Sequence, residues 1–382
     1  MASSRIGIAL LAAAMAVGGC STISKLNPFS SSSKVKPTPL APIQASVEMR
    51  LKWQASVGDA GDYVFKPAVV GDSVYAAGHD GTLARFDNGH TVWRIDVGQK
   101  LSGGVGADDK LVAVGTPMGE VLTFDAETGK PRWTARVSSE VLAAPAVSDD
   151  LVVVRAGDSQ LFAFAADDGK RRWVYQHTMP ILTLRSHVGV LLSQQVVVAG
   201  YPGGKLVVVK AKNGAPIWEA TVSLPKGSTE LERITDVSSL PVVDGREICA
   251  AAFQGHVTCF DIGTGNTMWS RDISSSVGLD MDRHHVYVTD DKGIVYAFDR
   301  ETGASVWKQD KLSLRNVSRP LALGRYVLVG DYQGYVHLLD ADDGAFAGRI
   351  ETDGSAIVAD PQPAPNGVVV QTLKGGVFDV SN

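Results

Sequence analysis

The sequence contains little cysteine and no excess of positive charge, and both shortages exclude functions. Only three of its 382 residues are cysteines, and their spacing does not match a zinc site. The 36 Lys and Arg residues against 41 Asp and Glu residues give a net charge of −5, which provides no general attraction for nucleic acid. A hydrophobic content of 45% and a charged content of 20% exclude disorder across the whole chain.

Several catalytic motifs are absent as well. The sequence contains no G-x-S-x-G, P-loop or H-E-x-x-H pattern. His284 and His285 are adjacent, so on a strand they point to opposite faces and cannot share a metal ion. We therefore expect no catalytic residue, no metal site and no cofactor.

Long apolar runs are limited to residues 6–17, which are too short to cross a bilayer as a helix of the mature protein. Arg5 precedes this run, and residues 17–20 (VGGC) follow it. The arrangement resembles the signal peptide and lipobox of bacterial lipoproteins. It implies that residues 1–19 are removed and that Cys20 is acylated, with palmitate as a typical chain, which anchors the protein to a membrane.

The segment after Cys20 has the composition of a linker. In lipoproteins generally, a Ser at position 21 implies sorting to the outer membrane, here at its periplasmic face. Residues 20–44 are rich in Ser and Pro, and we expect a tether with a root-mean-square reach of roughly 25–30 Å. The folded domain is expected over residues 45–382.

Tryptophan recurs at a nearly constant interval. The seven Trp residues stand at positions 53, 93, 133, 173, 218, 269 and 307, with intervals of 40, 40, 40, 45, 51 and 38 residues. One further step of 41 reaches Gly348 in the same sequence context, and a Gly stands four residues before each position from 93 to 348. Short apolar runs separated by Gly turns fill each unit. Periods of about 40 residues with several strands each predict the blades of a β-propeller.

The Gly and the Trp of each unit have structural explanations. Gly adopts the positive φ that a tight hairpin requires. A Trp on an outer strand covers the neighbouring sheet and buries roughly 150–250 Å². Residues 51–57 carry Trp53 without a preceding unit, and the last unit stops before its own Trp strand. We therefore expect an all-β, eight-bladed propeller whose N-terminal strand completes the last blade and closes the ring.

Cys249 and Cys259 flank a predicted hairpin turn at Gln254-Gly255. The periplasm permits a disulfide between them. Two small buried hydrophobic residues are an equally good interpretation. The sequence leaves both open, because the strand register decides between them.

The repeat resembles that of a known family. The pattern Asp-x-x-Thr-Gly-x-x-x-Trp at 125–133 and 299–307 is similar to the tryptophan-docking motif of eight-bladed propellers in the quinoprotein alcohol dehydrogenase, or PQQ-like, class. Within this class, the lipobox, the tether, the eight units and the segments 180–185 and 231–243 resemble the BamB family of outer-membrane β-barrel assembly lipoproteins. The quinone-dependent enzymes of the class characteristically have a vicinal disulfide and long insertions, which this sequence does not contain.

The repeat is interrupted at two consecutive units. The intervals of 45 and 51 residues contain insertions at 177–189 and 223–240, which we expect to lie side by side because consecutive units are neighbours in a ring. Loops on a rigid scaffold commonly carry binding residues. Leu182, Leu184 and Arg185 in the first insertion suit a protein interface.

The resemblance implies a partner for this region. In the BamB family, a Leu-x-Leu-Arg segment and an Asp-x-Asp segment contribute to binding the periplasmic POTRA domains of BamA, the barrel-assembly protein. The segment ending at Arg185 matches the first pattern, and Asp236 matches the first acid of the second, but Ser238 stands in place of the second acid. Asp236 and Arg233 are therefore candidate partner-binding residues. Alternatively, Asp236 forms a salt bridge with Arg185 or Arg233 that orients the loop.

Together these features predict a non-catalytic lipoprotein scaffold of the outer-membrane β-barrel assembly complex that binds BamA and assists insertion of outer-membrane proteins. Unfolded outer-membrane proteins are a further candidate partner, by strand addition to open sheet edges. A quinone-cofactor enzyme and a glycan-binding propeller are alternatives with the same fold. The sequence does not indicate which face of the ring meets BamA.

Overall fold

Residues 36–382 are the part of the chain described by the structure, a computed structural model, and they consist of β-strands and loops. The expected signal peptide, Cys20 and the tether up to residue 35 lie outside the described residues. No helix in the described part is both long and apolar enough to cross a membrane.

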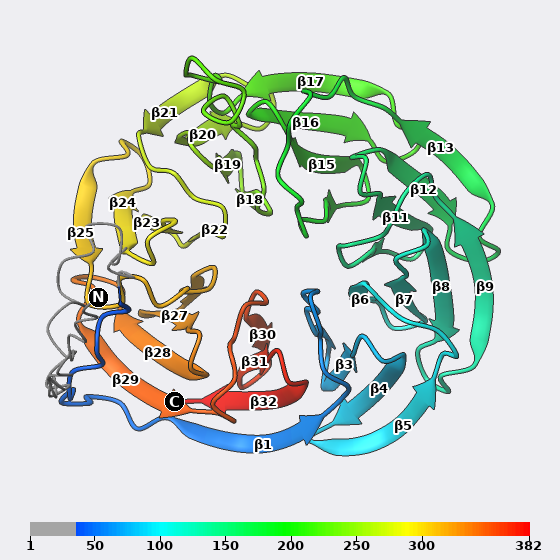
Figure 1. The fold of residues 1–382 in the computed structure, drawn as a ribbon, viewed down its shortest axis with the longest axis horizontal. Helices are drawn as coiled ribbons and strands as arrows, with labels where there is room; N and C mark the ends of the chain where they lie inside the picture. Colours follow the sequence, from blue (N-terminus) through cyan, green and yellow to red (C-terminus); the bar gives the residue numbers. More distant parts are fainter. Residues whose placement is uncertain (1–35) are drawn as a thin grey trace, which may run out of the picture. The chain divides into compact units, whose positions relative to one another are not determined.

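Eight four-stranded antiparallel sheets, here called blades 1 to 8, surround a central axis (Figure 1). Blades 1 to 7 each use four consecutive strands, ordered from the inner to the outer strand. Blade 8 contains β30, β31 and β32 and takes its outer strand, β1, from the N-terminal part of the chain. The eight-bladed, all-β propeller predicted from the repeat is therefore confirmed.

The strands have the following bounds. Blade 1 comprises β2 (Ala68–Val70), β3 (Ser73–Ala77), β4 (Thr82–Asp87) and β5 (His90–Asp96); blade 2 comprises β6 (Gly103–Ala107), β7 (Leu111–Gly115), β8 (Glu120–Asp125) and β9 (Pro131–Arg136). Blade 3 comprises β10 (Ala146–Val147), β11 (Leu151–Arg155), β12 (Leu161–Ala165) and β13 (Arg171–Tyr175); blade 4 comprises β14 (Leu191–Leu192), β15 (Val196–Tyr201), β16 (Lys205–Lys210) and β17 (Pro216–Thr221). Blade 5 comprises β18 (Val242–Asp244), β19 (Glu247–Ala251), β20 (Val257–Asp261) and β21 (Thr267–Arg271); blade 6 comprises β22 (Gly278–Met281), β23 (His285–Thr289), β24 (Val295–Asp299) and β25 (Ser305–Gln309). Blade 7 comprises β26 (Leu321–Leu323), β27 (Tyr326–Gly330), β28 (Tyr335–Asp340) and β29 (Phe346–Glu351); blade 8 comprises β30 (Gln362–Ala364), β31 (Gly367–Gln371), β32 (Gly376–Ser381) and β1 (Arg50–Ser56).

The core consists of eight apolar clusters, one between each pair of neighbouring blades. Successive residues of a strand point to opposite faces, so each middle strand contributes to the clusters on both sides of its blade. In β11, Val152 and Val154 pack toward blade 2, whereas Leu151 and Val153 pack toward blade 4. This burial on both faces explains why the middle strands are continuous apolar runs.

Each Trp of an outer strand lies over the Gly of the last hairpin in the next blade. A Cβ atom built on Gly344 would lie 2.6 Å from the ring of Trp307, and the φ of 72° at Gly344 also favours glycine. The indole N–H of Trp307 donates a hydrogen bond to the carbonyl of Ala341 in that blade at 2.8 Å. The repeat spacing of Gly and Trp therefore encodes contacts between blades. The pairs are Trp53–Gly89, Trp93–Gly129, Trp133–Gly169, Trp173–Gly214, Trp218–Gly265, Trp269–Gly303 and Trp307–Gly344.

The Asp and Thr of the motif shape the same hairpin. Asp299 Oδ1 accepts hydrogen bonds from the backbone N–H of Thr302 at 2.8 Å and from its hydroxyl at 2.6 Å, while the N–H of Gly303 donates to Asp299 O at 2.8 Å. The bond from the Thr302 side chain lowers the pKa of Asp299 below its ordinary value. Asp125 and Asp261 have the equivalent bonds, so the motif carboxylates stabilise turns.

Blade 7 has Gly348 where the other outer strands have Trp, and the topology explains the exception. In blade 8, β32 leads to the C-terminus and the outer strand comes from elsewhere in the chain, so no hairpin is present on which a Trp of blade 7 would dock. Met49 occupies this space, and a Cβ atom on Gly348 would lie 2.9 Å from its Cγ. The N–H groups of Ser46 and Val47 donate to Ala347 O at 2.9 and 3.0 Å.

The segment of residues 37–49, here called the N-terminal strap, is bound to the propeller, although its first part was expected to belong to the tether. The N–H of Thr38 donates to Ser313 O at 3.1 Å, and the guanidinium of Arg349 donates to Ala41 O at 3.0 Å. These bonds use backbone carbonyl and N–H groups, which any sequence provides. The Ser/Pro composition therefore gave no sign of them.

Cys249 and Cys259 form a disulfide within blade 5. They are directly opposite each other in β19 and β20, and both are fully buried in the cluster that faces blade 6. The strand register thus decides the question that the sequence left open, because residues on either side of a short hairpin meet as a cross-strand pair.

Candidate functional site

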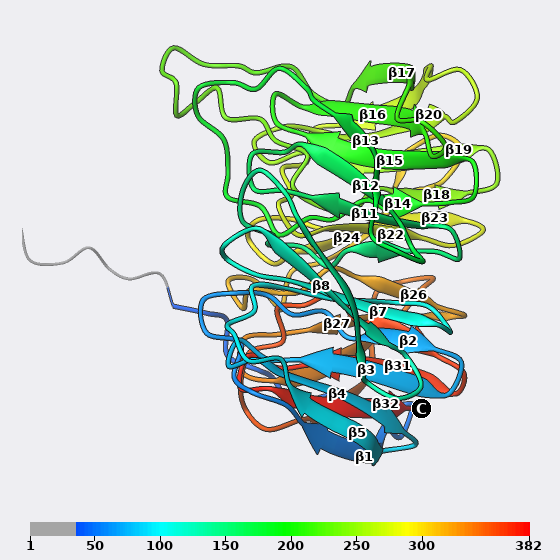
Figure 2. The same cartoon turned by 90° about the vertical axis from the view of Figure 1, so that its right-hand side faces the viewer.

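The two insertions lie at the same end of the ring, here called the crossover face. This face carries the segments that join the outer strand of one blade to the inner strand of the next. The first insertion joins β13 to β14, and the second joins β17 to β18. Figure 2 shows both insertions, in green, projecting on the same side of the ring.

Asp236 joins the two insertions. Its Oδ2 accepts a hydrogen bond from the backbone N–H of Leu184 at 2.6 Å, and its Oδ1 accepts one from the N–H of Gly203 at 3.2 Å. Two residues further along each insertion, Ser186 Oγ donates a hydrogen bond to Ser238 O at 3.4 Å. The expectation that the insertions lie side by side is therefore confirmed, and the carboxylate of Asp236 fixes their relative position.

Arg155 lies beneath this junction at the end of β11. Its guanidinium is 5.3 Å from the ring centre of Tyr201 and donates to Ser159 Oγ at 3.2 Å. Burial raises the pKa of Asp236, whereas the N–H groups of Leu184 and Gly203 and the charge of Arg155 act in the opposite direction. Asp236 is only 2% exposed, so its carboxylate acts inside the protein and is not a surface contact.

Both insertions expose large apolar side chains among polar and charged ones. Ile181 is 89% exposed and Leu182 is 41% exposed on the first insertion, and Leu224 and Leu231 are 64% and 67% exposed on the second. Large apolar side chains with this exposure on adjoining loops are typical of protein interaction surfaces. Leu184 is half-buried behind them.

Arg185 reaches toward a distant part of the chain. Its guanidinium lies 5.6 Å from the ring centre of Tyr63, in the segment between β1 and β2, and Tyr63 in turn stacks on His79. Ser139 lowers the pKa of Glu140 by a hydrogen bond, and the charge of Arg185 contributes in the same direction. The aromatic ring of Tyr63 and the carboxylate of Glu140 hold the Arg185 guanidinium in place at the crossover face.

The structure separates the predicted residues into two groups. Leu182 and Arg185 are exposed, and Leu184 and Asp236 connect the loops from below. Among residues 36–382, the Arg233 side chain bonds only within its own insertion, to Gly227 O at 3.1 Å and to Glu230 at 3.5 Å. The salt bridge suggested between Asp236 and Arg185 or Arg233 is wrong, because backbone N–H groups occupy the carboxylate.

Sequence reasoning missed Arg155, Tyr63 and Ile181. A charged residue at the end of the apolar run LVVVR was a usable signal, since a buried Arg needs a specific environment. Tyr63 gave no signal, because it meets Arg185 only through closure of the ring. Ile181 was part of the quoted segment, but its exposure depends on the loop conformation.

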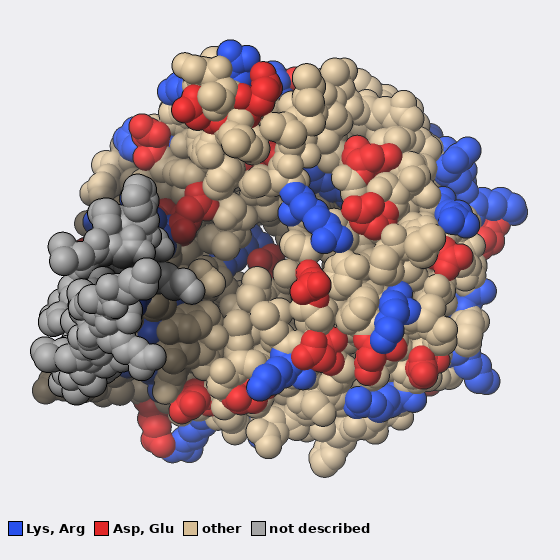
Figure 3. Space-filling model, viewed as in Figure 1, with Lys and Arg blue, Asp and Glu red and all other residues tan. Residues whose placement is uncertain are grey.

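A central cavity of about 620 Å³ opens beside these loops. Leu184, Arg185 and His187 form part of its wall, together with the entries to the inner strands of most blades. Figure 3 shows the hollow at the centre of the ring, with basic and acidic atoms at its edge and inside it. Burial lowers the pKa of His187, which favours the neutral ring.

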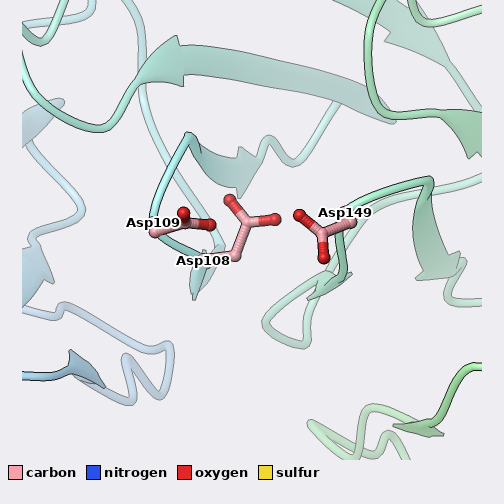
Figure 4. Close-up of side chains that lie close together, drawn as sticks. All are labelled: Asp108, Asp109 and Asp149. Carbon is pink, nitrogen blue, oxygen red and sulfur yellow. The ribbon is translucent and has the colours of Figure 1, made fainter.

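A group of acids lies elsewhere, where blades 2 and 3 meet. Figure 4 shows the carboxylate of Asp108 between those of Asp109 and Asp149. The N–H groups of Lys110 and Leu111 donate to Asp108 Oδ1 at 2.9 and 2.7 Å, and Lys110 Nζ pairs with Asp149 at 2.7 Å. A turn and an exposed ion pair therefore account for this group, and we assign no metal to it.

Comparison with known proteins identifies the relatives of the chain. Residues 79–309 match the family model described as "Outer membrane protein assembly factor BamB". The protein of that name from Bordetella pertussis is 41% identical over 377 residues, covering 98% of this chain and 96% of the relative. The one from Pseudomonas aeruginosa is 40% identical over 358 residues, covering 92% of each chain.

Solved structures agree with the fold. The crystal structure of BamB from Moraxella catarrhalis matches with a TM-score of 0.82 and 28% identity, covering 88% of this chain and 100% of that one. Quinohemoprotein alcohol dehydrogenase from Comamonas testosteroni matches with a TM-score of 0.70 at 12% identity, which shows a common fold alone. Because relatives that are 41% and 40% identical cover 98% and 92% of this chain, the chain belongs to the BamB family of outer membrane protein assembly factors.

Proposed function

We propose that this protein is a non-catalytic scaffold in outer-membrane protein assembly. It is anchored through lipid on Cys20 to the periplasmic face of the outer membrane and binds the POTRA domains of BamA. Its partner surface is the crossover face of blades 3 to 5, where Ile181, Leu182 and Arg185 are exposed. The observation that carries this assignment is the bond from Leu184 to Asp236, which joins two insertions into one surface.

The proposed mechanism is positioning. Blades packed on both faces form a rigid support, and the hydrogen bonds of Asp236 reduce the freedom of the loops before binding. A preorganised apolar surface with an Arg held over an aromatic ring loses little conformational entropy on contact with a partner. The scaffold would thus hold the POTRA region in a geometry that assists insertion of outer-membrane proteins.

The test is a pull-down of BamA from detergent-solubilised outer membranes, comparing wild type with Leu182→Ala/Arg185→Ala. We expect wild type to retain BamA and the variant to lose about 2 kcal/mol of binding free energy or more, roughly thirtyfold in affinity, because apolar and Arg anchors dominate interfaces. A matched control is Ile217→Ala/Arg172→Ala, which truncates an exposed pair on the outer strands of the same blades. Equal retention by both variants would move the site elsewhere, and no retention by wild type would contradict the scaffold.

Asp236→Ala tests the indirect role of the buried carboxylate. The variant leaves the exposed residues in place but removes the acceptor of the Leu184 and Gly203 N–H groups, at a cost of about 1–3 kcal/mol. We expect faster amide hydrogen exchange in both insertions and weaker retention of BamA. Glu232→Ala is the control, since in the described part of the chain its carboxylate bonds only within the second insertion. Unchanged exchange at Leu184 would show that Asp236 does not hold the loop.

A further inference from the structure

The central cavity carries a surplus of positive charge on a mostly apolar wall. Its wall is mostly small and apolar, with Gly104, Gly106 and Ala107 from β6 among the lining residues. Three basic side chains line it, Lys66, Arg185 and Arg319, against one acid, Asp360. This surplus of positive charge occurs in a chain whose net charge is −5.

Lys66 is the centre of this surplus. Its backbone is fixed, because its N–H donates to Gly104 O at 2.8 Å and its carbonyl accepts from the N–H of Val105 at 2.7 Å. Among residues 36–382, its amine forms no hydrogen bond or ion pair, although burial in the wall lowers its pKa. Lys66 is partly buried and lines the cavity, so its unpaired amine is open to an anion that enters the cavity.

The remaining charges indicate what kind of anion fits. Arg319 donates to Leu279 O at 2.7 Å and lies 3.4 Å from Asp360, so much of its charge is already balanced. Asp280, close to Arg319 but outside the lining, accepts the N–H of Ala322 at 2.8 Å, and burial raises its pKa. Asp360 repels a dianion more strongly than a monoanion, so a monoanion suits Lys66 better.

We propose that the central cavity is a binding site for a small organic monocarboxylate. The carboxylate pairs with the amine of Lys66, and the apolar body lies against the small side chains of the wall. A cavity of about 620 Å³ has the size of ordinary ligand pockets. The site meets the proposed partner surface at Arg185, which also lines the cavity, whereas Ile181 and Leu182 do not line it.

Calorimetric titration of the purified chain with hexanoate tests the proposal. We expect one site per chain with a dissociation constant of about 1 mM or tighter. Hexanol, which has the same apolar body without the charge, and inorganic phosphate are expected to give no binding. Lys66→Met should weaken hexanoate binding at least about tenfold, whereas Lys212→Met, at an exposed hairpin, should leave it unchanged.

A second variant changes binding in the opposite direction, which excludes misfolding as an explanation. Asp360→Asn removes the acid that competes for the cations, and we expect hexanoate to bind about threefold to tenfold more tightly. The proposal would be overturned if hexanoate did not bind to wild type, or if it bound equally to wild type and Lys66→Met. Equal binding of hexanol would also overturn it, because the charge would then have no role.

Discussion

Deletion of residues 45–57 is expected to destabilise the entire ring and not only one blade. The deletion removes β1, which pairs along its length with β32, and exposes the edge of blade 8. It also removes apolar side chains from two clusters, because Leu51 packs between blades 7 and 8 and Trp53 packs between blades 8 and 1. Truncation of one large aromatic residue alone costs about 3–5 kcal/mol, so we expect a total loss of about 10 kcal/mol.

The measurement is thermal unfolding followed by circular dichroism. Since a whole domain has a stability of about 5–15 kcal/mol, the truncated chain should unfold cooperatively more than about 10 °C lower, or fail to fold. Trp53→Ala should give a smaller decrease in the same direction. Replacing residues 226–232, an exposed part of the second insertion, by a Gly/Ser segment of equal length is the control and should change the transition little. Unchanged unfolding after deletion would mean that β1 does not close the ring.

The blade count was predictable because the repeat marks eight equivalent positions, seven occupied by Trp and the last, at 348, by Gly. Each Trp contacts the Gly of the next blade, so seven such contacts repeat the period, and the departure at Gly348 did not obscure it. The cause of that departure was not predictable. It follows from the absence of a hairpin in blade 8 and from Met49, which is 299 positions away in the sequence (348 − 49).

The position of the candidate site was predictable from the sequence, but its hydrogen bonds and buried charges were not. Unequal repeat intervals located the insertions, and ring order placed them together. The bonding of Asp236 was not accessible, because an acid in a polar loop has the same sequence pattern whether it faces solvent or binds backbone N–H groups. The cavity charges were hidden for another reason, since Lys66 and Arg319 lie 253 positions apart (319 − 66) and meet only in the closed ring.

Asp331→Ala is expected to lower the free energy of unfolding by about 3–5 kcal/mol. Asp331 is fully buried in blade 7, and its Oδ2 binds Arg315 Nε at 2.8 Å and His337 Nε2 at 3.0 Å. Its Oδ1 accepts the N–H groups of Gln333 and Tyr335 at 2.9 and 3.1 Å. Removal of this carboxylate leaves a guanidinium that is 2% exposed without its counter-ion, which is the main reason for the expected loss.

The network also connects blade 7 to the N-terminal strap. Arg315 Nη1 donates to Thr38 O at 3.1 Å, and Arg349, which donates to His337 Nδ1 at 3.0 Å, also donates to the strap. Because Arg349 uses Nδ1 as an acceptor, the proton of the neutral ring lies on Nε2 and is donated to Asp331. Loss of Asp331 should therefore increase hydrogen exchange in the strap as well as lower stability.

Protonation of His337 provides an independent measure of the same network. Burial lowers the pKa of His337 below its ordinary value of 6.5, so on acidification the unfolded chain binds the proton first. Stability contributed by the neutral ring is thus present above pH 6.5 and decreases as the pH falls below it; His187 acts in the same direction. The pKa of Asp331 is itself lowered by His337 and Arg315 despite burial, so its contribution is present above its ordinary value of 3.8 and is lost only at lower pH.

Denaturant unfolding at pH 7.5 and 5.5 distinguishes these contributions. Wild type should be less stable at pH 5.5, and His337→Gln should reduce this pH dependence by removing one of the two histidines. Asp149→Ala, which breaks an exposed ion pair with Lys110, is the matched control and should change stability by less than about 1 kcal/mol. Adding Arg315→Met to Asp331→Ala should recover part of the loss, because the uncompensated charge is then removed. If Asp331→Ala instead stays within about 1 kcal/mol of wild type, the buried network does not stabilise blade 7, and the strap must be held by its apolar contacts.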